Sequence, residues 1–374
     1  MIIENKWIVL ESETVFGDLV VENNIIQSIQ KKEPNKSIPI EYVMPGFIDL
    51  HIHGSNGYDA MDSEKDSVMN MALSLVKEGT TAFLPTTMTQ TKKNIEQALT
   101  NIANYIPNQN PNAAIVLGVH LEGPFIHKGA AGAQPLNCII EANTTLFDHF
   151  QSVSKHNIKK VSLAPDIEGA IPMIEHLKTT GVVASIAHTK ANYAIVLKAI
   201  EAGASSLTHT YNAMTPLHHR DVGVVGAALL HDELNAELIY DLIHVSIPAA
   251  QILLKAKGAD GISLITDSMR AKYLAPGIYD LGGQSVHIKN NEARLIDGTL
   301  AGSILKMNEG VKNLIQTLNM TPSMASKLAS LNPAKQLKVD HLMGSIEVGK
   351  LANLVILNQD YDVIHTIING KVVF

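Results

Sequence analysis

The sequence has little of several features that define whole classes of protein. It contains one cysteine, Cys138, and one thiol cannot form an internal disulfide. It has no run of about 18 apolar residues, which is the length that a membrane-spanning helix needs. Its N-terminus, MIIENKWIVLESE, carries acidic residues where a signal peptide needs a basic start and an apolar core. These absences predict a cytoplasmic protein without disulfides.

An excess of positive charge is also absent. The formal net charge of −7 argues against a nucleic acid or an anionic membrane as the partner. An anionic small molecule would therefore have to be held by a local cluster of basic and polar side chains. The sequence also contains no phosphate-cradling P-loop and no Gly-x-Ser-x-Gly nucleophile elbow.

What the chain does have is enough apolar material for a large core, with 374 residues of which 46% are hydrophobic. Both ends read as short β-strands joined by turn residues, which are Glu22-Asn23-Asn24 near the start and Asn369-Gly370 near the end. Neither end has enough apolar surface to fold alone. Residues 1–44 and 338–374 are therefore predicted to form one small β-sandwich domain together.

Residues 45–337 alternate short apolar strands with amphipathic helical stretches such as 65–79 and 192–203, which is typical of βα units around a parallel sheet. Eight strands in this order predict an α/β fold, a TIM-type (β/α)8 barrel. The predicted strands are FIDLHIH (47–53), TTAFL (80–84), AAIVLGVH (113–120), KVSLA (160–164), VVASIAH (182–188), SSLTH (205–209), ELIYDLI (237–243) and ISLITD (262–267).

Imidazoles and carboxylates gather at the ends of these strands. In the stretch MPGFIDLHIHG, His51 and His53 point to one face of a strand and lie roughly 7 Å apart along it, so they can converge on one cation. Alone, this pair could simply be the polar side of a strand. Core histidines without a function would be scattered over helices and both ends of the barrel, whereas the strand-end positions here are His51, His53, Glu122, His188, His209, His244 and Asp267. This concentration predicts a metal site.

The residue types favour a hydrolytic metal centre. Imidazole and carboxylate suit zinc, iron and similar divalent ions, whereas a thiolate site would need more cysteines than Cys138. Such a cation lowers the pKa of bound water from 15.7 to about 7, and catalysis then needs a carboxylate that carries protons. Asp267, at the end of the eighth strand, is the candidate for that role rather than a turn residue.

The segment THTYNAMTPLHHRDVG after the sixth strand is the candidate site for an anion. It contains Asn212, His218, His219 and Arg220. A guanidinium with nearby amides suits a phosphate group, although the same residues could form an exposed basic turn.

Taken in order, these motifs resemble the amidohydrolase superfamily and, within it, the branch of N-acetylglucosamine-6-phosphate deacetylases. GFIDLHIHG marks the superfamily, whereas HLEGPF and the THxxNAM pattern are specific to the deacetylase branch. The matching blocks occur in order and cover nearly the whole chain. They are MPGFIDLHIHG, GVHLEGPFI, GAQP, IAHT, LTHTYNAMTPLHHRDVG, LITDSM, DGTLAGS and GSIEVGKLANLVIL. The resemblance implies hydrolysis of the acetamide of a phosphorylated amino sugar to acetate and glucosamine-6-phosphate.

The resemblance also implies roles for individual residues. Glu122, His188 and His209 would hold the catalytic metal, and Asp267 would be the general acid/base. Members that keep the His-x-His pair can hold a second metal, so His51 and His53 imply a two-metal centre of zinc or iron bridged by Glu122, with one metal as the alternative. The implied substrate contacts are Ala133, Gln134, Asn212, Ala213, Arg220, His244, Leu300, Ala301, Gly302 and Ser303.

Two details of the resemblance concern particular residues. Gln134 stands where some relatives carry a histidine, and an amide can donate a hydrogen bond but cannot carry a positive charge. Arg220 is implied to reach a neighbouring subunit, which would make the protein a homodimer.

Two other readings of the sequence are possible. A dihydroorotase-like or hydantoinase-like amidase would use a modified lysine at the end of the fourth strand, but Lys159 and Lys160 stand at the beginning of that strand. A non-catalytic binding relative would have lost metal ligands, and this chain lacks none of the expected ones.

Overall fold

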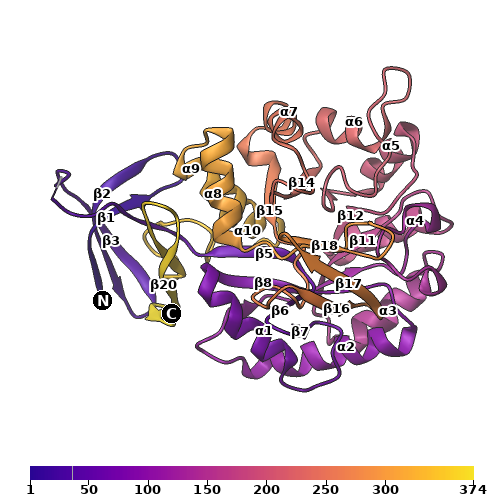
Figure 1. Cartoon of the computed structure of the whole chain (residues 1–374), viewed down its shortest axis with the longest axis horizontal. Helices are drawn as coiled ribbons and strands as arrows, with labels where there is room; N and C mark the ends of the chain where they lie inside the picture. The colour runs from indigo at the N-terminus through magenta and orange to yellow at the C-terminus, as the bar shows by residue number, and fades with distance from the viewer. Residues whose placement is uncertain (36) are drawn as a thin grey trace.

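The computed structural model describes residues 1–35 and 37–374, and its larger part is a parallel β-barrel ringed by helices (Figure 1). Eight strands follow one another around the barrel in chain order. They are β5 (Phe47–Ile52), β8 (Thr80–Thr87), β10 (Val119–Glu122), β11 (Ile158–Leu163), β12 (Val183–Ile186), β13 (Ser206–Leu207), β14 (Asn235–Ile239) and β15 (Ile262–Ile265). This confirms the predicted TIM-type barrel.

The barrel closes between its last and first strands, and this closure joins two predicted site segments. The backbone N–H of Asp267 donates to the carbonyl of His51 at 2.8 Å, and the N–H of His53 donates to the carbonyl of Ser268 at 2.9 Å. Hydrogen bonds between segments more than 200 residues apart therefore fix the loop after β15 against the end of β5.

The strands form where they do because both of their faces are covered. All six residues of β5 and all eight of β8 are buried, as expected for strands enclosed between a barrel interior and outer helices.

The third strand differs from the prediction. Gly118, at φ +154°, interrupts the run 113–120, leaving a short side strand β9 (Ile115–Val116) and then β10. Glu122 is thus the last residue of β10 rather than a residue after it.

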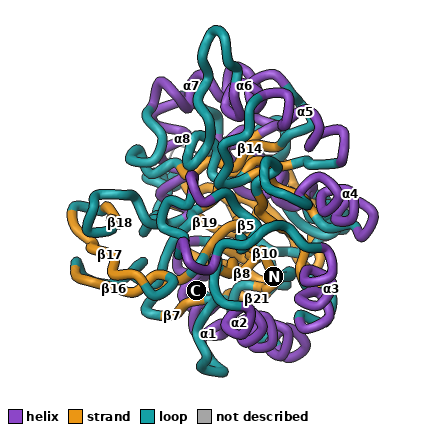
Figure 2. The backbone as a smooth tube through the Cα atoms, turned by 90° about the vertical axis from the view of Figure 1, so that its right-hand side faces the viewer, coloured by secondary structure: helices purple, strands orange, loops and turns teal. Residues whose placement is uncertain are grey.

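Helices lie outside the strands, and Figure 2 shows α1 to α7 around the barrel. The predicted helix at 192–203 illustrates the local cause: Asn192 accepts a hydrogen bond from the N–H of Ile195 at 3.0 Å, and Gly203 ends the helix at φ +117°. The helices are α1 (Ser67–Leu75), α2 (Lys92–Tyr105), α3 (Thr144–Val153), α4 (Ala170–Thr180), α5 (Tyr193–Ala202), α6 (Gly223–Leu230), α7 (Ile247–Lys257), α8 (Met307–Leu318), α9 (Pro322–Ser326) and α10 (Asn332–Gln336).

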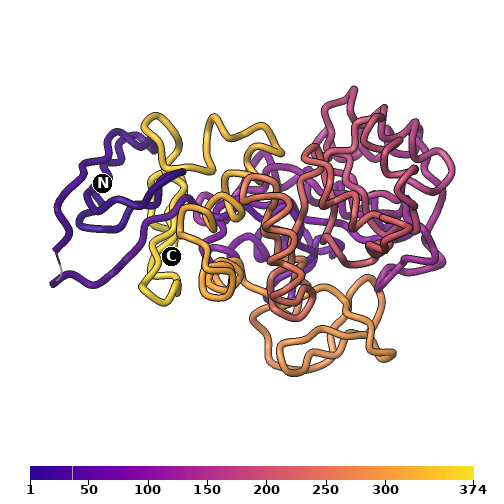
Figure 3. The backbone as a smooth tube through the Cα atoms, turned by 90° about the horizontal axis from the view of Figure 1, so that it is seen from above, coloured from indigo at the N-terminus to yellow at the C-terminus, as the bar shows by residue number. Residues whose placement is uncertain are grey.

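The two chain termini come together beside the barrel, as predicted, and Figure 3 shows the indigo and yellow ends of the chain lying together. They form one seven-stranded sheet, whereas a β-sandwich was predicted. Both predicted turns are present, with positive φ at Asn23, Asn24, Asn369 and Gly370, the conformation that type I′ hairpins require. The strand order is β21 (Lys371–Val372), β20 (Val363–Ile368), β19 (Leu354–Asn358), β4 (Glu41–Pro45), β1 (Ile2–Val9), β2 (Thr14–Glu22) and β3 (Ile25–Lys31). The domain boundaries at 44/45 and 337/338 stay a prediction.

A second small sheet follows the barrel and was not predicted. Its antiparallel strands are β16 (Gly277–Leu281), β17 (Gln284–Lys289) and β18 (Glu292–Arg294), and a two-stranded ribbon, β6 (Gly54–Ser55) with β7 (Tyr58–Asp59), follows β5. Leu281, Val286 and Ile288 of the small sheet pack on Met88 and Met269 at the mouth of the barrel. In residues 1–35 and 37–374, no helix combines the length and apolarity needed to cross a bilayer.

Candidate active site

A cavity of about 380 Å³ lies at the C-terminal ends of the barrel strands. This is the end at which TIM-barrel enzymes carry their active sites, because loops from all eight strands meet there. Most of the residues singled out in the sequence line it, namely His53, Glu122, Ala133, Gln134, His188, His209, Asn212, Ala213, His244, Asp267, Leu300 and Gly302.

His51, His53 and Asp267 form a first triad of buried ligand atoms on the floor of the cavity. The Nε2 atoms of His51 and His53 are 3.3 Å apart. The Oδ1 atom of Asp267 lies 3.4 Å from the first and 3.2 Å from the second. The pair that alternates along β5 therefore converges on one point, as its spacing predicts.

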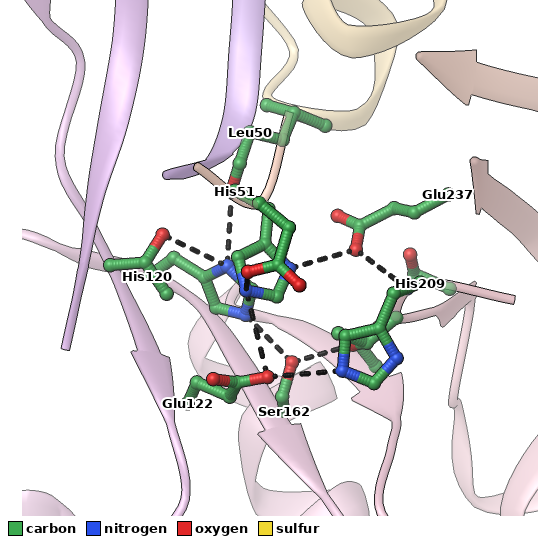
Figure 4. A network of polar contacts seen from close by, with 12 residues as sticks. Leu50, His51, His120, Glu122, Ser162, His209 and Glu237 are labelled. Atoms are coloured by element: carbon green, nitrogen blue, oxygen red, sulfur yellow. Dashed lines mark hydrogen bonds and ion pairs between the residues drawn. The ribbon is translucent and has the colours of Figure 1, made fainter. Parts of the chain in front are cut away.

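Glu122, His188 and His209 form a second triad beside the first. Figure 4 shows Glu122 and His209 of this triad close to His51 of the first. Oε1 of Glu122 lies 3.3 Å from Nε2 of each of these histidines, which are themselves 3.1 Å apart. Oε2 of Glu122 lies 3.3 Å from Nε2 of His53. The two oxygens of one carboxylate thus face the two triads, as a bridging ligand requires.

Three of these residues have a strained backbone. His188, His209 and Asp267 have φ values of 42°, 33° and 48°, in the left-handed region that residues other than glycine rarely adopt. Each such residue costs on the order of 1 to 3 kcal/mol and is found where the surrounding structure holds it for a function. Here the turn lies directly after a barrel strand and directs the side chain into the cavity.

His53 and His188 are held by the ring nitrogens that face away from the other ligand atoms. Nδ1 of His53 lies 3.1 Å from the carbonyl of Thr86, and Nδ1 of His188 lies 2.9 Å from that of Ala130. A carbonyl accepts only from N–H, so the proton sits on Nδ1 and the Nε2 lone pair faces the other ligands. This arrangement fits a divalent cation in each triad.

The charges of the two carboxylates also fit a cation. Burial alone would raise the pKa of Glu122, but positive charge on His51 and the imidazoles of His188 and His209 beside its Oε1 atom hold that pKa well below its ordinary value. Burial would also raise the pKa of Asp267, but His51 and His53 hold that pKa below its ordinary value. Both groups are therefore carboxylates, the form that ligates metals.

Comparison with known proteins agrees with this geometry, since the model of the amidohydrolase family matches residues 42–373. This chain belongs to the amidohydrolase family. It is 44% identical to N-acetylglucosamine-6-phosphate deacetylase of Bacillus subtilis (strain 168), covering 100% of this chain and 97% of that one. It is 38% identical to N-acetylgalactosamine-6-phosphate deacetylase of Escherichia coli O157:H7, covering 88% and 87%. The crystal structure of N-acetylglucosamine-6-phosphate deacetylase from Thermotoga maritima has a TM-score of 0.92 at 35% identity, covering 100% and 99%.

Within this amidohydrolase, Gln134 supports the metal-facing carboxylate. Its Nε2 donates to Oε2 of Glu122 at 2.7 Å, and its Oε1 accepts from the backbone N–H of Thr89 at 2.8 Å. Both ends of the amide are therefore engaged by the protein. Gln134 also lines the cavity, and its contact with substrate stays a prediction.

Some predicted substrate residues lie outside the cavity of this amidohydrolase chain. Arg220 is on an exposed loop, where its Nη1 lies 2.5 Å from Nε2 of His219. Ala301 and Ser303 are buried and do not line the cavity, unlike Leu300 and Gly302. The backbone N–H of Ser303 donates to the carbonyl of Asp267 at 2.8 Å. Their substrate contacts stay predictions.

Three charged residues near the amidohydrolase site were not assigned a role from the sequence. Lys190 lines the cavity, and its position two residues after His188 at a strand end was a signal that could have found it. Lys160 and Glu237 are fully buried inside the barrel. Lys160 is the third of the six residues of β11, whereas the prediction made it the first, and it is not at the end of that strand. The sequence alone did not indicate its partner.

Proposed function

We propose that this chain is a metal-dependent deacetylase that converts N-acetylglucosamine-6-phosphate into glucosamine-6-phosphate and acetate. The observation that carries the proposal is the pair of triads that share Glu122 on the floor of one cavity. The resemblance of the whole chain to deacetylases of acetylated amino-sugar phosphates supports the substrate class. Zinc and iron suit the donor set of imidazoles and carboxylates, with one or two ions per chain.

When bound, a divalent cation polarises the amide carbonyl and lowers the pKa of a water molecule to near neutrality. The remaining chemistry belongs to Asp267, which faces both His51 and His53 and lines the cavity. As a carboxylate it takes a proton from the attacking water, and as an acid it passes that proton to the amine nitrogen as the C–N bond breaks. Proton transfer to nitrogen is needed because an unprotonated amine is a poor leaving group.

The phosphate end of the substrate needs a positive charge, and Lys190 is a cation that lines the cavity. Its backbone N–H donates to Oδ2 of Asp166 at 3.0 Å, which anchors the residue beside His188. We assign Asn212 and Ala213 to polar contacts with the phosphate, because they lie on the adjacent loop after β13, where the carbonyl of Ala213 accepts from the backbone N–H of Thr189 at 3.1 Å. Arg220 lies outside this cavity, so its predicted role belongs to the cavity of a neighbouring subunit in a homodimer.

A substrate comparison tests the proposed function. Acetate release is measured from N-acetylglucosamine-6-phosphate, N-acetylgalactosamine-6-phosphate and unphosphorylated N-acetylglucosamine, with metal analysis of the same preparation. We expect turnover of the first substrate to be fastest and to disappear when the metal is removed by a chelator and return when zinc or iron is added. Metal-independent turnover, or no turnover of either phosphorylated sugar by metal-loaded protein, would contradict the proposal.

Substitution of Lys190 by alanine should weaken use of the phosphorylated substrate selectively. A hydrogen bond to a charged group contributes about 1.5 to 3 kcal/mol, so kcat/KM should fall about 10- to 150-fold. The unphosphorylated sugar should be hydrolysed as before. Lys198→Ala, on the neighbouring helix α5 and outside the cavity, is the matched control.

Arg220→Ala separates the two proposed cations. If Arg220 serves a neighbouring subunit, this variant should show the same selective loss for the phosphorylated sugar, and the protein should sediment as a dimer. A monomeric enzyme that is fully active would refute the role of Arg220 and leave that of Lys190 standing.

A further inference from the structure

A lysine and a glutamate form an ion pair inside the barrel, beneath the two triads. Lys160 of β11 and Glu237 of β14 are both fully buried, and Nζ of Lys160 contacts Oε1 of Glu237. Nζ also donates to Oγ of Ser206 at 3.0 Å. Removing two charges from water is costly, and a hydrophobic pair of similar volume would often be at least as stable. A contribution to stability alone therefore does not account for the pair.

The other oxygen of Glu237 contacts both triads. Oε2 lies 3.4 Å from Nδ1 of His51 in the first triad and accepts from the backbone N–H of His209 in the second at 3.3 Å. Figure 4 shows Glu237 between these two residues. Its carboxylate is thus the link between the buried lysine and the cavity floor.

The environment of His51 differs from that of the other histidines of the triads. His53 and His188 direct Nδ1 to backbone carbonyls, and Nδ1 of His209 has no hydrogen-bond partner among the described residues. The Nδ1 atom of His51 faces a carboxylate instead. A carboxylate both fixes the tautomer of a ligating histidine and increases the basicity of its other nitrogen.

We propose that Lys160 and Glu237 are a positioning pair for the metal of the first triad. Glu237 accepts the Nδ1 proton of His51, which leaves the Nε2 lone pair directed at the cation. Lys160 balances the charge of that carboxylate and fixes the oxygen that does not contact His51. The inference rests on the proposed metal centre and adds to it two residues from the interior of the barrel.

The test replaces both charges together, because Lys160 left alone in the barrel would be an uncompensated buried charge. The variant Lys160→Met/Glu237→Gln keeps approximately the same side-chain volumes. The matched control is Lys272→Met/Glu78→Gln, which removes another fully buried pair whose atoms are 2.9 Å apart. In the described structure that pair makes no hydrogen bond to either triad. Its removal therefore shows how the loss of a buried ion pair away from the metal ligands affects stability and zinc binding.

Zinc binding to the metal-free proteins is measured by competition with a chelator, together with metal content and the melting temperature of the metal-free form. Loss of such an outer contact typically weakens metal affinity about 10- to 100-fold. We therefore expect this loss at one of two sites in Lys160→Met/Glu237→Gln, with the second site unchanged. The control should bind zinc like the unsubstituted protein, whatever its melting temperature.

Several outcomes would overturn the inference. These are a folded Lys160→Met/Glu237→Gln protein that keeps both affinities, an equal loss in the control, and an unsubstituted protein that binds zinc only once. None of these outcomes would contradict the proposed deacetylase activity. If Lys160→Met/Glu237→Gln does not fold, Glu237→Asp is measured instead. It keeps the charge but shortens the side chain by one methylene, so it too should weaken zinc at one site, and unchanged affinity would overturn the inference. Failure of the unsubstituted protein to bind any metal would instead refute the proposed function.

Discussion

Replacing Asp267 with asparagine should reduce turnover by about 10² to 10⁴, the usual contribution of a general acid/base. Asparagine has nearly the same shape and keeps one side-chain oxygen toward His53, but it cannot accept the proton of water and pass it to the departing amine. The backbone of Asp267 is held by the carbonyl of His51 and by the N–H of Ser303, both at 2.8 Å, so the side chain should keep its position.

The measurement is kcat for acetate release, with metal content and binding of glucosamine-6-phosphate determined on the same protein. Metal content and product binding should change far less than kcat. Asp59→Asn is a useful control, because Asp59 is also a buried carboxyl group but lies beside Arg270 outside the cavity, and that variant should retain most of its turnover. Near-normal turnover in metal-loaded Asp267→Asn would remove Asp267 from the mechanism.

Replacing His51 with glutamine and His53 with asparagine should lower the bound metal from about two ions to about one per chain. The reason is that this double variant removes two of the three ligand atoms of the first triad, whereas Glu122, His188 and His209 remain for the second. Metal analysis after gel filtration measures the change, and circular dichroism shows whether the fold survives.

The control for this variant is His149→Gln/His176→Gln, which removes two partly exposed histidines from helices α3 and α4 outside the cavity. That protein should keep the metal content of the unsubstituted chain. Two metals in the folded His51/His53 variant would show that the first triad does not bind one. One metal in the unsubstituted protein would show that the site is mononuclear although the His-x-His pair is present.

Local patterns were sufficient for most of the fold because their causes are local. The Asn369-Gly370 pair favours the positive φ values of a type I′ turn through its own residue types, and it closes the hairpin of β20 and β21 as predicted. Apolar runs bounded by turns likewise marked each barrel strand to within a few residues. The exception, at 113–120, arose because the break at Gly118 depends on a backbone angle that an apolar run does not reveal.

The small sheet of β16 to β18 shows the opposite case. Its strands are short, and the longest, β17, does alternate buried Val286 and Ile288 with exposed polar residues, which was a signal that could have found it. In β16, by contrast, only Leu281 is buried, so the pattern of that strand is weak. The small sheet is ordered by packing of Leu281, Val286 and Ile288 on Met88 and Met269, which come from other loops. Such contacts form only after the barrel has brought those loops together.

By itself, the sequence determined which residue types stand at the ends of the barrel strands. Because all parallel strands of a barrel point the same way, it also determined that these residues share one end of the fold. Only the tertiary structure decided how they are arranged. Glu122 faces both triads, Lys190 lines the cavity whereas Arg220 does not, and Lys160 contacts Glu237. These last two residues are 77 positions apart on strands separated by two others. Their meeting depends on the closure of the barrel, which no local pattern encodes.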